Sequence, residues 1–291
     1  MIDSMRETFS MGELCEAFEV SPSSYYAWKQ SKPTKRSKQD RQIIEAIKAI
    51  HSHRHMKSYG SPRMTEELKS RNFRCGRHRV AKLMREQGIF VGPRKAFRPR
   101  TTKVDKTARI APNHLAKACA PNAPGQQLVS DITYLRTKQG WLYLSILVDL
   151  FSRAVISWDL SDSLAAESVS KAIKKAQSNG SMQPGCIFHS DRGCQYTSDH
   201  VRKTLGQGIQ QSMSAKGYCY DNAFAETCFA TIKAEMLPQS QIFESKLDAR
   251  RAVFDYSETF YNRTRRHSSL GQISPLQFLQ LYNKKQNVHL N

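Results

Sequence analysis

From residue 126 onward, strand-like and helix-like segments follow one another in an order that few folds can accept. Three apolar segments come first, at about 128–135, 141–150 and 154–160, with a turn at 138–140 between the first two. Helices near 164–178, 198–206 and 221–237 then alternate with strands near 186–189 and 209–213. Three meandering strands followed by this alternation predict an α/β fold, a mixed five-stranded sheet flanked by helices.

The first 90 residues indicate an all-α region instead. Two short helices are expected within 9–30, a longer one at about 38–54, another from Ser61-Pro62, and a last one at about 77–87. The last helix has an apolar stripe, and its other faces carry Arg77, Arg79, Lys82 and Arg85. A short helix, a turn and a basic second helix match a helix-turn-helix reader of the DNA major groove. An ordinary helical hairpin with a solvated face is the alternative.

Charge is distributed unevenly along the chain. Lys and Arg number 45 against 25 Asp and Glu, and residues 1–112 hold 25 of the basic and 11 of the acidic side chains. Residues 91–125 resemble a basic, proline-containing linker whose cations include Arg94, Lys95, Arg98 and Arg100. Such a segment fits an extended arm along phosphates or a disordered tether. The obvious partner is nucleic acid.

The cysteines and the hydropathy pattern restrict the compartment. Seven scattered cysteines without a CxxC spacing favour reduced thiols over a disulfide framework. A zinc site is a weak alternative, because its candidate ligands lack paired spacing. Those candidates are His51, His53, His55, Cys75 and His78. With no apolar run of transmembrane length and no signal-peptide pattern, we expect a soluble, cytoplasmic protein.

Three acids occupy positions typical of a shared metal site. Asp131 lies within the first predicted strand, Asp191 follows the fourth, and Glu226 lies in a predicted helix after the fifth. In a sheet of this order the first and fourth strands can be neighbours, which places both aspartates at one end. Three carboxylates suit Mg²⁺ or Mn²⁺ better than zinc. Two such ions, roughly 4 Å apart, support in-line phosphoryl displacement.

Three polar neighbours fit the same interpretation. His189 lies two residues before Asp191, where it could support the site or touch DNA, and Asn222 lies four residues before Glu226 on the same helical face. Lys233, two helical turns beyond Glu226, is placed to grip a phosphate beside the cut. Taken singly, a satisfied sheet histidine is the better explanation of His189, and a solvated helix lysine is the better explanation of Lys233.

Asp149 is the main competing carboxylate. It ends the second predicted strand, and Arg153, four residues on, is a natural ion-pair partner, so we interpret it as structural. Asp221 is expected to cap the helix of Glu226.

The C-terminal region, residues 245–291, indicates a helix followed by a basic turn and a final helix from Ser274-Pro275. The buried side of the first helix is predicted to hold Leu247, Val253, Phe254, Phe260 and Tyr261. The basic turn contains Arg263, Arg265, Arg266 and His267. We expect this turn to touch DNA, and a cationic helix C-terminus favoured by the helix dipole is the alternative.

Several motifs together resemble one family, and they cover the chain from about residue 20 to its end. They are VSDITYL, GWLYLSILVDLFSR, FHSDRGCQYTS, QSMSAKGYCYDNAFAETCFATIK and FYNRTRRHSSLGQISPLQF. This set is similar to the second-reading-frame product of two-frame bacterial insertion sequences, DDE transposases related to retroviral integrases. The resemblance implies an RNase H-like core at 126–240, after a helix-turn-helix region at 1–90 and the linker, with a C-terminal extension at 241–291.

By that resemblance, Asp131, Asp191 and Glu226 are the catalytic metal ligands, and Lys233 matches the basic residue two turns after the glutamate. The family commonly has 35 residues between the second Asp and the Glu, whereas this chain has 34. The implied partners are terminal inverted repeats and target DNA, further copies of the chain on DNA, and an upstream reading-frame product. The implied location is the bacterial nucleoid.

The sequence therefore predicts a transposase subunit that cleaves and joins DNA strands with Mg²⁺ or Mn²⁺. A non-catalytic DNA-binding regulator of the element is the rival from another class, although its core would not need three intact acids. A plain metal-dependent nuclease is a third possibility, which strand transfer would distinguish.

Overall fold

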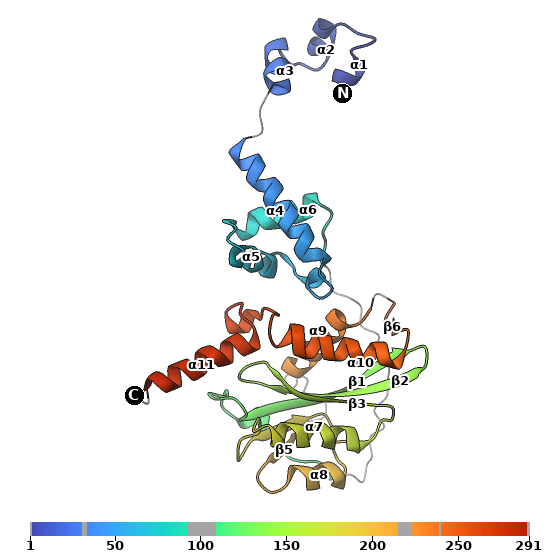
Figure 1. Ribbon diagram of the computed structural model, residues 1–291, viewed down its shortest axis with the longest axis vertical. Helices are drawn as coiled ribbons and strands as arrows, with labels where there is room; N and C mark the ends of the chain where they lie inside the picture. The colour runs from blue at the N-terminus through green and yellow to red at the C-terminus, as the bar shows by residue number, and fades with distance from the viewer. Residues whose placement is uncertain (1, 31–33, 92–108, 215–222, 239, 290–291) are drawn as a thin grey trace. The chain divides into compact units, whose positions relative to one another are not determined.

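The computed structural model describes residues 2–30, 34–91, 109–214, 223–238 and 240–289, without the side chains of 223–226 and 289. Its contacts divide the chain into two units, described separately below (Figure 1). One unit comprises Met1–Ser52 and Tyr59–Phe90, and the other comprises His53–Ser58 and Val91–Asn291.

The first unit is helical, as predicted. Its helices are α1 (Ile2–Met5), α2 (Met11–Ala17), α3 (Pro22–Lys29), α4 (Lys35–Ser52), α5 (Ser61–Ser70) and α6 (Arg77–Glu86). Ser10 and Glu13 form a capping box at the start of α2, and Ser21 caps α3 ahead of Pro22. The apolar stripes of α4, α5 and α6 are buried, with Ile47, Met64 and Val80 inaccessible to solvent. These stripes explain why three basic helices pack together.

The second unit is built on a mixed sheet in the strand order β3-β2-β1-β4-β5. The strands are β1 (Gln127–Thr137), β2 (Gly140–Asp149), β3 (Val155–Ser161), β4 (Ile187–Ser190) and β5 (Gln210–Met213). The first three strands pair antiparallel, while β4 pairs parallel with β1 and β5 pairs parallel with β4. A two-residue strand that was not predicted, β6 (Ile242–Phe243), pairs with the far end of β1.

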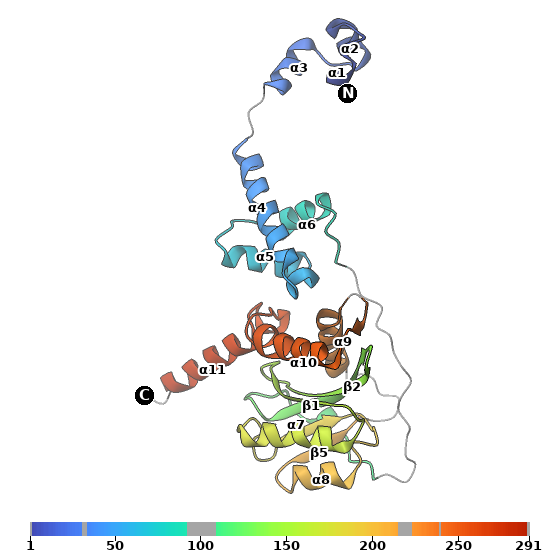
Figure 2. The ribbon, with the colours of Figure 1, turned by 45° about the vertical axis from the view of Figure 1, so that its right-hand side comes forward.

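Helices cover both faces of this sheet. Figures 1 and 2 show α7 (Ala166–Ser178) and α8 (Asp199–Leu205) on one face, and α9 (Ala223–Met236) and α10 (Lys246–Phe254) on the other. The α7 side forms a core that includes Leu147, Ile173 and Phe188, all fully buried. The sheet is therefore the middle of three layers. Because helices cover both of its faces, a functional site is expected at the ends of the strands.

The C-terminal region differs in part from its prediction. After α10, residues Asp255–Tyr261 wind as a π-helix, a 3₁₀ turn spans Ser268–Leu270, and α11 covers Pro275–His289. The predicted burial of Leu247 and Phe254 is wrong, because they are 55% and 56% exposed, whereas Phe260 and Tyr261 are buried. Leu247 and Phe254, seven residues apart, share one side of α10, whereas Ala249, Ala252 and Val253 on the other side are buried, so for those two residues the prediction chose the wrong side of that helix. The wider winding of the π-helix then brings Tyr261 to the buried side.

Two short 3₁₀ turns lie outside these layers, at Met56–Ser58 and Leu115–Lys117. Among the described residues, none of the helices is both long and apolar enough to span a membrane. The six described cysteines are free thiols, and Cys219 lies outside the described residues.

Candidate active site

Asp131 and Asp191 come together at the pairing of β1 with β4, as predicted for neighbouring strands. In the parallel register Val129 lies opposite His189, so the positions two residues further along are Asp131 and Asp191. Asp131 lies within β1 and Asp191 directly follows β4. Neighbouring strands run about 4.8 Å apart, which brings two carboxylates to the same edge of the site.

Tyr196 independently shows that both acids are close. It is buried, and its hydroxyl is 2.9 Å from the Ser130 hydroxyl. Burial raises the pKa of Tyr196 well above its ordinary value, and the negative charges of Asp131 and Asp191 raise it further. Tyr196 therefore stays neutral beside two carboxylates. Tyr196 was not among the predicted site residues, although it lies in the same FHSDRGCQYTS motif as Asp191.

The Asp191 carboxylate has little to balance its charge. The backbone N–H of Gly193 donates to its Oδ1 at 2.9 Å, and within the described part of the chain that is its hydrogen-bond donor. Burial raises the pKa of Asp191, and the Gly193 bond offsets this only in part. A Cβ at Gly193 would lie 3.0 Å from the same oxygen, so glycine lets the loop fold this tightly. A desolvated carboxylate of this kind is well suited to bind a cation.

Glu226 lies in the first turn of α9, whose backbone is described from Ala223. Its side chain, together with Asn222 and Asp221, lies outside the described residues. Where the structure describes side chains, no three His, Cys, Asp or Glu residues gather closely enough to hold a metal ion. Of the three predicted ligands, Asp131 and Asp191 are the two whose side chains are described, and their hard oxygen donors fit Mg²⁺ or Mn²⁺.

Helix α9 is fixed by its apolar side. Phe229, Ile232 and Met236 are buried at helical spacing. By helix geometry, position 226 lies about 120° around the helix from Ile232 and about 20° from the half-buried Lys233, which is about 10.5 Å further along the axis.

His189 is held inside the second unit by hydrogen bonds to two serines. It is fully buried, with Nδ1 2.9 Å from the Ser212 hydroxyl and Nε2 3.1 Å from the Ser214 hydroxyl. The histidine therefore ties β4 to β5 and the segment after it. The prediction that His189 touches DNA is corrected, because a side chain without exposed surface cannot contact DNA in this state.

Asp149 is structural, as interpreted from sequence, and its hydrogen bonds come from the surrounding loops. It accepts from the backbone N–H of Gly125 (3.0 Å) and from the N–H and hydroxyl of Ser152 (2.8 and 2.5 Å). Arg153 contributes its charge nearby. A carboxylate with three donors and 1% exposure has no room for a metal ion.

The basic C-terminal turn is only partly a surface feature. Arg265 is 3% exposed and paired with Glu235, so its prediction as a DNA contact is corrected. Arg263 is exposed, with Nε donating to the Glu258 carbonyl at 3.0 Å. Arg266 is half-buried and donates to the Gln272 carbonyl at 3.0 Å.

In the helical unit, the basic side chains of α6 also divide into two groups. Arg77, Lys82 and Arg85 are exposed. Arg79 instead pairs with Asp40 of α4 at 2.7 Å and is partly buried, which fixes the packing of the two helices. The linker cations Arg94, Lys95, Arg98 and Arg100 lie outside the described residues.

Comparison with known families agrees with this geometry. Residues 121–219 and 207–275 each match a family model described as an integrase core domain, and residues 38–97 match an HTH-like domain. The InsF transposase of insertion sequence IS3A from Escherichia coli K12 is 35% identical over 279 residues, covering 95% of this chain and 96% of InsF. The chain belongs to the transposases of bacterial insertion sequences.

A second relative of this transposase is an uncharacterized 31 kDa protein of insertion element IS600 from Shigella sonnei. It is 37% identical over 272 residues, covering 93% of the transposase and 99% of the relative. Among solved structures, the HTLV-2 integrase catalytic core domain in complex with magnesium aligns with 54% of the transposase and 97% of its own chain. The identity there is 17% and the TM-score 0.40. The sheet and its helices confirm the predicted mixed α/β fold class, and the family matches confirm the predicted integrase core and helix-turn-helix region of the transposase.

Proposed function

We propose that this transposase cuts a DNA strand at the end of its element and joins the freed 3′-hydroxyl to another phosphodiester. Asp131, Asp191 and Glu226 would hold two Mg²⁺ or Mn²⁺ ions for both steps. The observation that carries the proposal is the register of β1 and β4, which sets two carboxylates side by side, one of them desolvated. Bound ions would activate the attacking oxygen and stabilise the leaving oxygen.

The residues of the chain then have separate tasks. The β1–β4 ladder holds the positions of Asp131 and Asp191. Gly193 engages one oxygen of Asp191 through its N–H, which leaves the other oxygen for a ligand. The Tyr196 hydroxyl stays neutral, so it would lie beside the two carboxylates without adding a negative charge. Glu226 would supply the third carboxylate from the first turn of α9, and no Ser, Cys or His would be needed as a nucleophile or base.

DNA recognition would use the helical unit and the remaining surface cations. The exposed Arg77, Lys82 and Arg85 on α6 match a recognition helix with phosphate and base contacts. Lys233, Asn222, Arg263 and Arg266 would contact strands near the chemistry, and Arg94, Lys95, Arg98 and Arg100 would follow the backbone. Terminal inverted repeats and target DNA are the proposed substrates.

Assembly and cellular partners are part of the same proposal. Copies of the chain would act as an oligomer on paired element ends, in the bacterial cytoplasm and at the nucleoid. An upstream reading-frame product would act as a fusion partner or a separate subunit.

The test is strand transfer in vitro with labelled element-end DNA and Mg²⁺ or Mn²⁺, with and without the upstream product. Glu226→Gln is expected to abolish joined products, and Asp199→Asn is the matched control, since that acid is exposed on α8. Tight, salt-sensitive binding without cleavage under every condition would support the regulator instead. Cleavage without joining would support a nuclease.

A further inference from the structure

A buried ion pair grips the C-terminal end of α9. The Nε of Arg265 donates to Oε2 of Glu235 at 2.6 Å, and a terminal nitrogen donates to Oε1 at 2.8 Å. The Tyr256 hydroxyl donates to the same Oε2 at 2.9 Å. Arg265 is 3% exposed, Glu235 is 6% exposed and Tyr256 is fully buried. We refer to Glu235, Arg265 and Tyr256 as the α9 clamp.

The same C-terminal segment holds α9 a second time, two turns earlier. The Tyr261 hydroxyl lies 3.2 Å from Cys228 Sγ, and the Arg265 guanidinium lies over the Tyr261 ring at 5.6 Å. The π-helix brings Tyr256 and Tyr261 to one side, with ring centroids 5.8 Å apart. In an α-helix, residues five apart would point in different directions. The unusual winding therefore allows one segment to contact both Cys228 and Glu235.

Stability alone is a weak reason for this arrangement. Burying two charges requires removing both from water, and well-packed apolar residues of similar size often stabilise a fold equally well. A planar guanidinium paired with a carboxylate through two parallel bonds adds something an apolar contact lacks, which is a fixed orientation. The apolar side of α9, with Phe229, Ile232 and Met236, does not specify the rotation of the helix so narrowly.

Orientation of α9 matters because the helix carries Glu226. Glu235 lies nine residues after Glu226, which corresponds to about 13.5 Å along the helix and half a turn around it. A rotation or slide at one end of so short a rigid element is passed on to the other end. We propose that the α9 clamp is a positioning device, which sets position 226 relative to Asp131 and Asp191. This inference rests on the proposed function.

The test replaces the clamp by apolar groups and leaves no buried polar partner behind. In the triple variant Glu235→Met, Arg265→Leu and Tyr256→Phe, we expect a thermal midpoint near that of the wild type. Strand transfer should fall by about tenfold or more, and the Mn²⁺ concentration for half-saturation, measured calorimetrically without DNA, should rise by a similar factor. Wild-type strand transfer and Mn²⁺ affinity in a folded triple variant would overturn the proposal.

Arg265→Lys keeps the charge and loses the two-pronged geometry. Its strand transfer and Mn²⁺ affinity should fall between those of the wild type and the triple variant, and this variant decides the question if the triple variant does not fold. Wild-type values for folded Arg265→Lys would then count against a positioning role.

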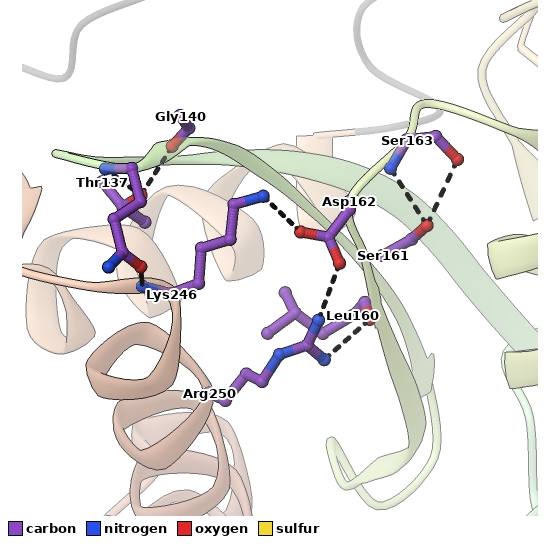
Figure 3. Close-up of polar contacts among 9 residues, drawn as sticks. Thr137, Gly140, Leu160, Ser161, Asp162, Ser163, Lys246 and Arg250 are labelled. Atoms are coloured by element: carbon purple, nitrogen blue, oxygen red, sulfur yellow. Dashed lines mark hydrogen bonds and ion pairs between the residues drawn. The ribbon is translucent and has the colours of Figure 1, made fainter.

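The matched control is the ion network that holds α10, shown in Figure 3. Asp162 pairs there with Lys246 at 2.6 Å and Arg250 at 3.1 Å, close to the end of β3. Asp162→Asn with Lys246→Met removes an ion pair from the same unit without touching α9, and should leave both readouts unchanged. If the wild type binds Mn²⁺ but joins no DNA, the proposed function fails while the affinity comparison still tests the clamp. If the wild type binds no Mn²⁺, both proposals fail.

Discussion

Asp149 is the last residue of β2 and Asp191 directly follows β4 of the same sheet, yet the two carboxylates accept very different sets of hydrogen bonds. Three donors within 3.0 Å satisfy Asp149, which is 1% exposed. Asp191 receives one backbone N–H from the described residues, and burial raises its pKa. The difference teaches that the number of donors supplied, rather than burial, separates a structural carboxylate from one prepared for a cation.

The largest effect is expected at the poorly balanced carboxylate. Asp191→Asn should reduce strand transfer by about 10³-fold or more, because several kcal/mol of charge stabilisation by bound ions is lost. Its thermal midpoint without divalent ions should not fall, since the variant removes a desolvated charge and its amide oxygen still accepts from Gly193. Scanning calorimetry and a strand-transfer gel check the two halves. A large drop in midpoint would place Asp191 in the same class as Asp149.

The opposite result is expected at the satisfied carboxylate. Asp149→Asn puts an NH₂ group against donors that need an acceptor, which should cost about 2–3 kcal/mol of unfolding free energy. The thermal midpoint should fall by roughly 5–10 °C. Strand transfer, measured well below that midpoint, should remain at the wild-type level. Loss of Mn²⁺ binding by a folded Asp149→Asn would break the comparison.

A third carboxylate, that of Asp255, forms a hydrogen bond with the buried His55. The His55 Nε2 lies 2.7 Å from Asp255 Oδ2, and the ring stacks on Phe260 with centroids 5.0 Å apart. Burial lowers the pKa of His55, even though the hydrogen bond to Asp255 raises it. As pH falls through 6.5, the ordinary pKa of histidine, the folded state therefore binds fewer protons than the unfolded state.

The stability of the second unit should accordingly decrease as pH falls from 7 to 5. Burial raises the pKa of Asp255, but hydrogen bonds from His55 and Thr259 leave it lowered overall. A further loss of stability is thus expected as pH falls through the range where Asp255 is protonated. Chemical denaturation of the wild type and His55→Phe measures the effect, and the variant should show the shallower slope between pH 7 and 5. Equal slopes would mean that His55 does not titrate differently on folding.

The smallest effect is expected at the exposed acid. The Asp162 side chain is 55% exposed, and Lys246 and Arg250 lower its pKa, the hydrogen bond from Lys246 most of all. Water screens such pairs, which contribute at most about 1 kcal/mol. Asp162→Asn should shift the thermal midpoint by no more than about 2–4 °C. A shift as large as that of Asp149→Asn would show that exposure is a poor guide to the ranking.

The sequence was most informative where local patterns determine structure. Alternating and apolar segments predicted β1 to β5 within a few residues, and their order predicted that β1 and β4 are neighbours. The acids Asp131 and Asp191 followed from their places at those strands. The two-residue strand β6 was missed, because among the described residues it pairs with the distant end of β1.

The wrong predictions concern residues whose environment is determined by partners far away in the sequence. In the run Arg263 to His267, nothing local distinguishes Arg265 from the arginines beside it, and its partner Glu235 lies on another helix. His189 lies in a motif beside a predicted metal ligand, yet its two serine partners belong to β5 and the residue after it. The π-helix likewise has no local composition that would have predicted it.

The order of the chain gives the α9 clamp a consequence for synthesis. The ribosome makes α9, with Glu226 and Glu235, before it makes Arg265. A growing or truncated chain that stops short of Arg265 leaves the Glu235 carboxylate without its cation, and a buried, unpaired charge strongly disfavours docking of that helix. Under the proposed function, the cutting centre would therefore be completed only after Arg265 has been synthesised.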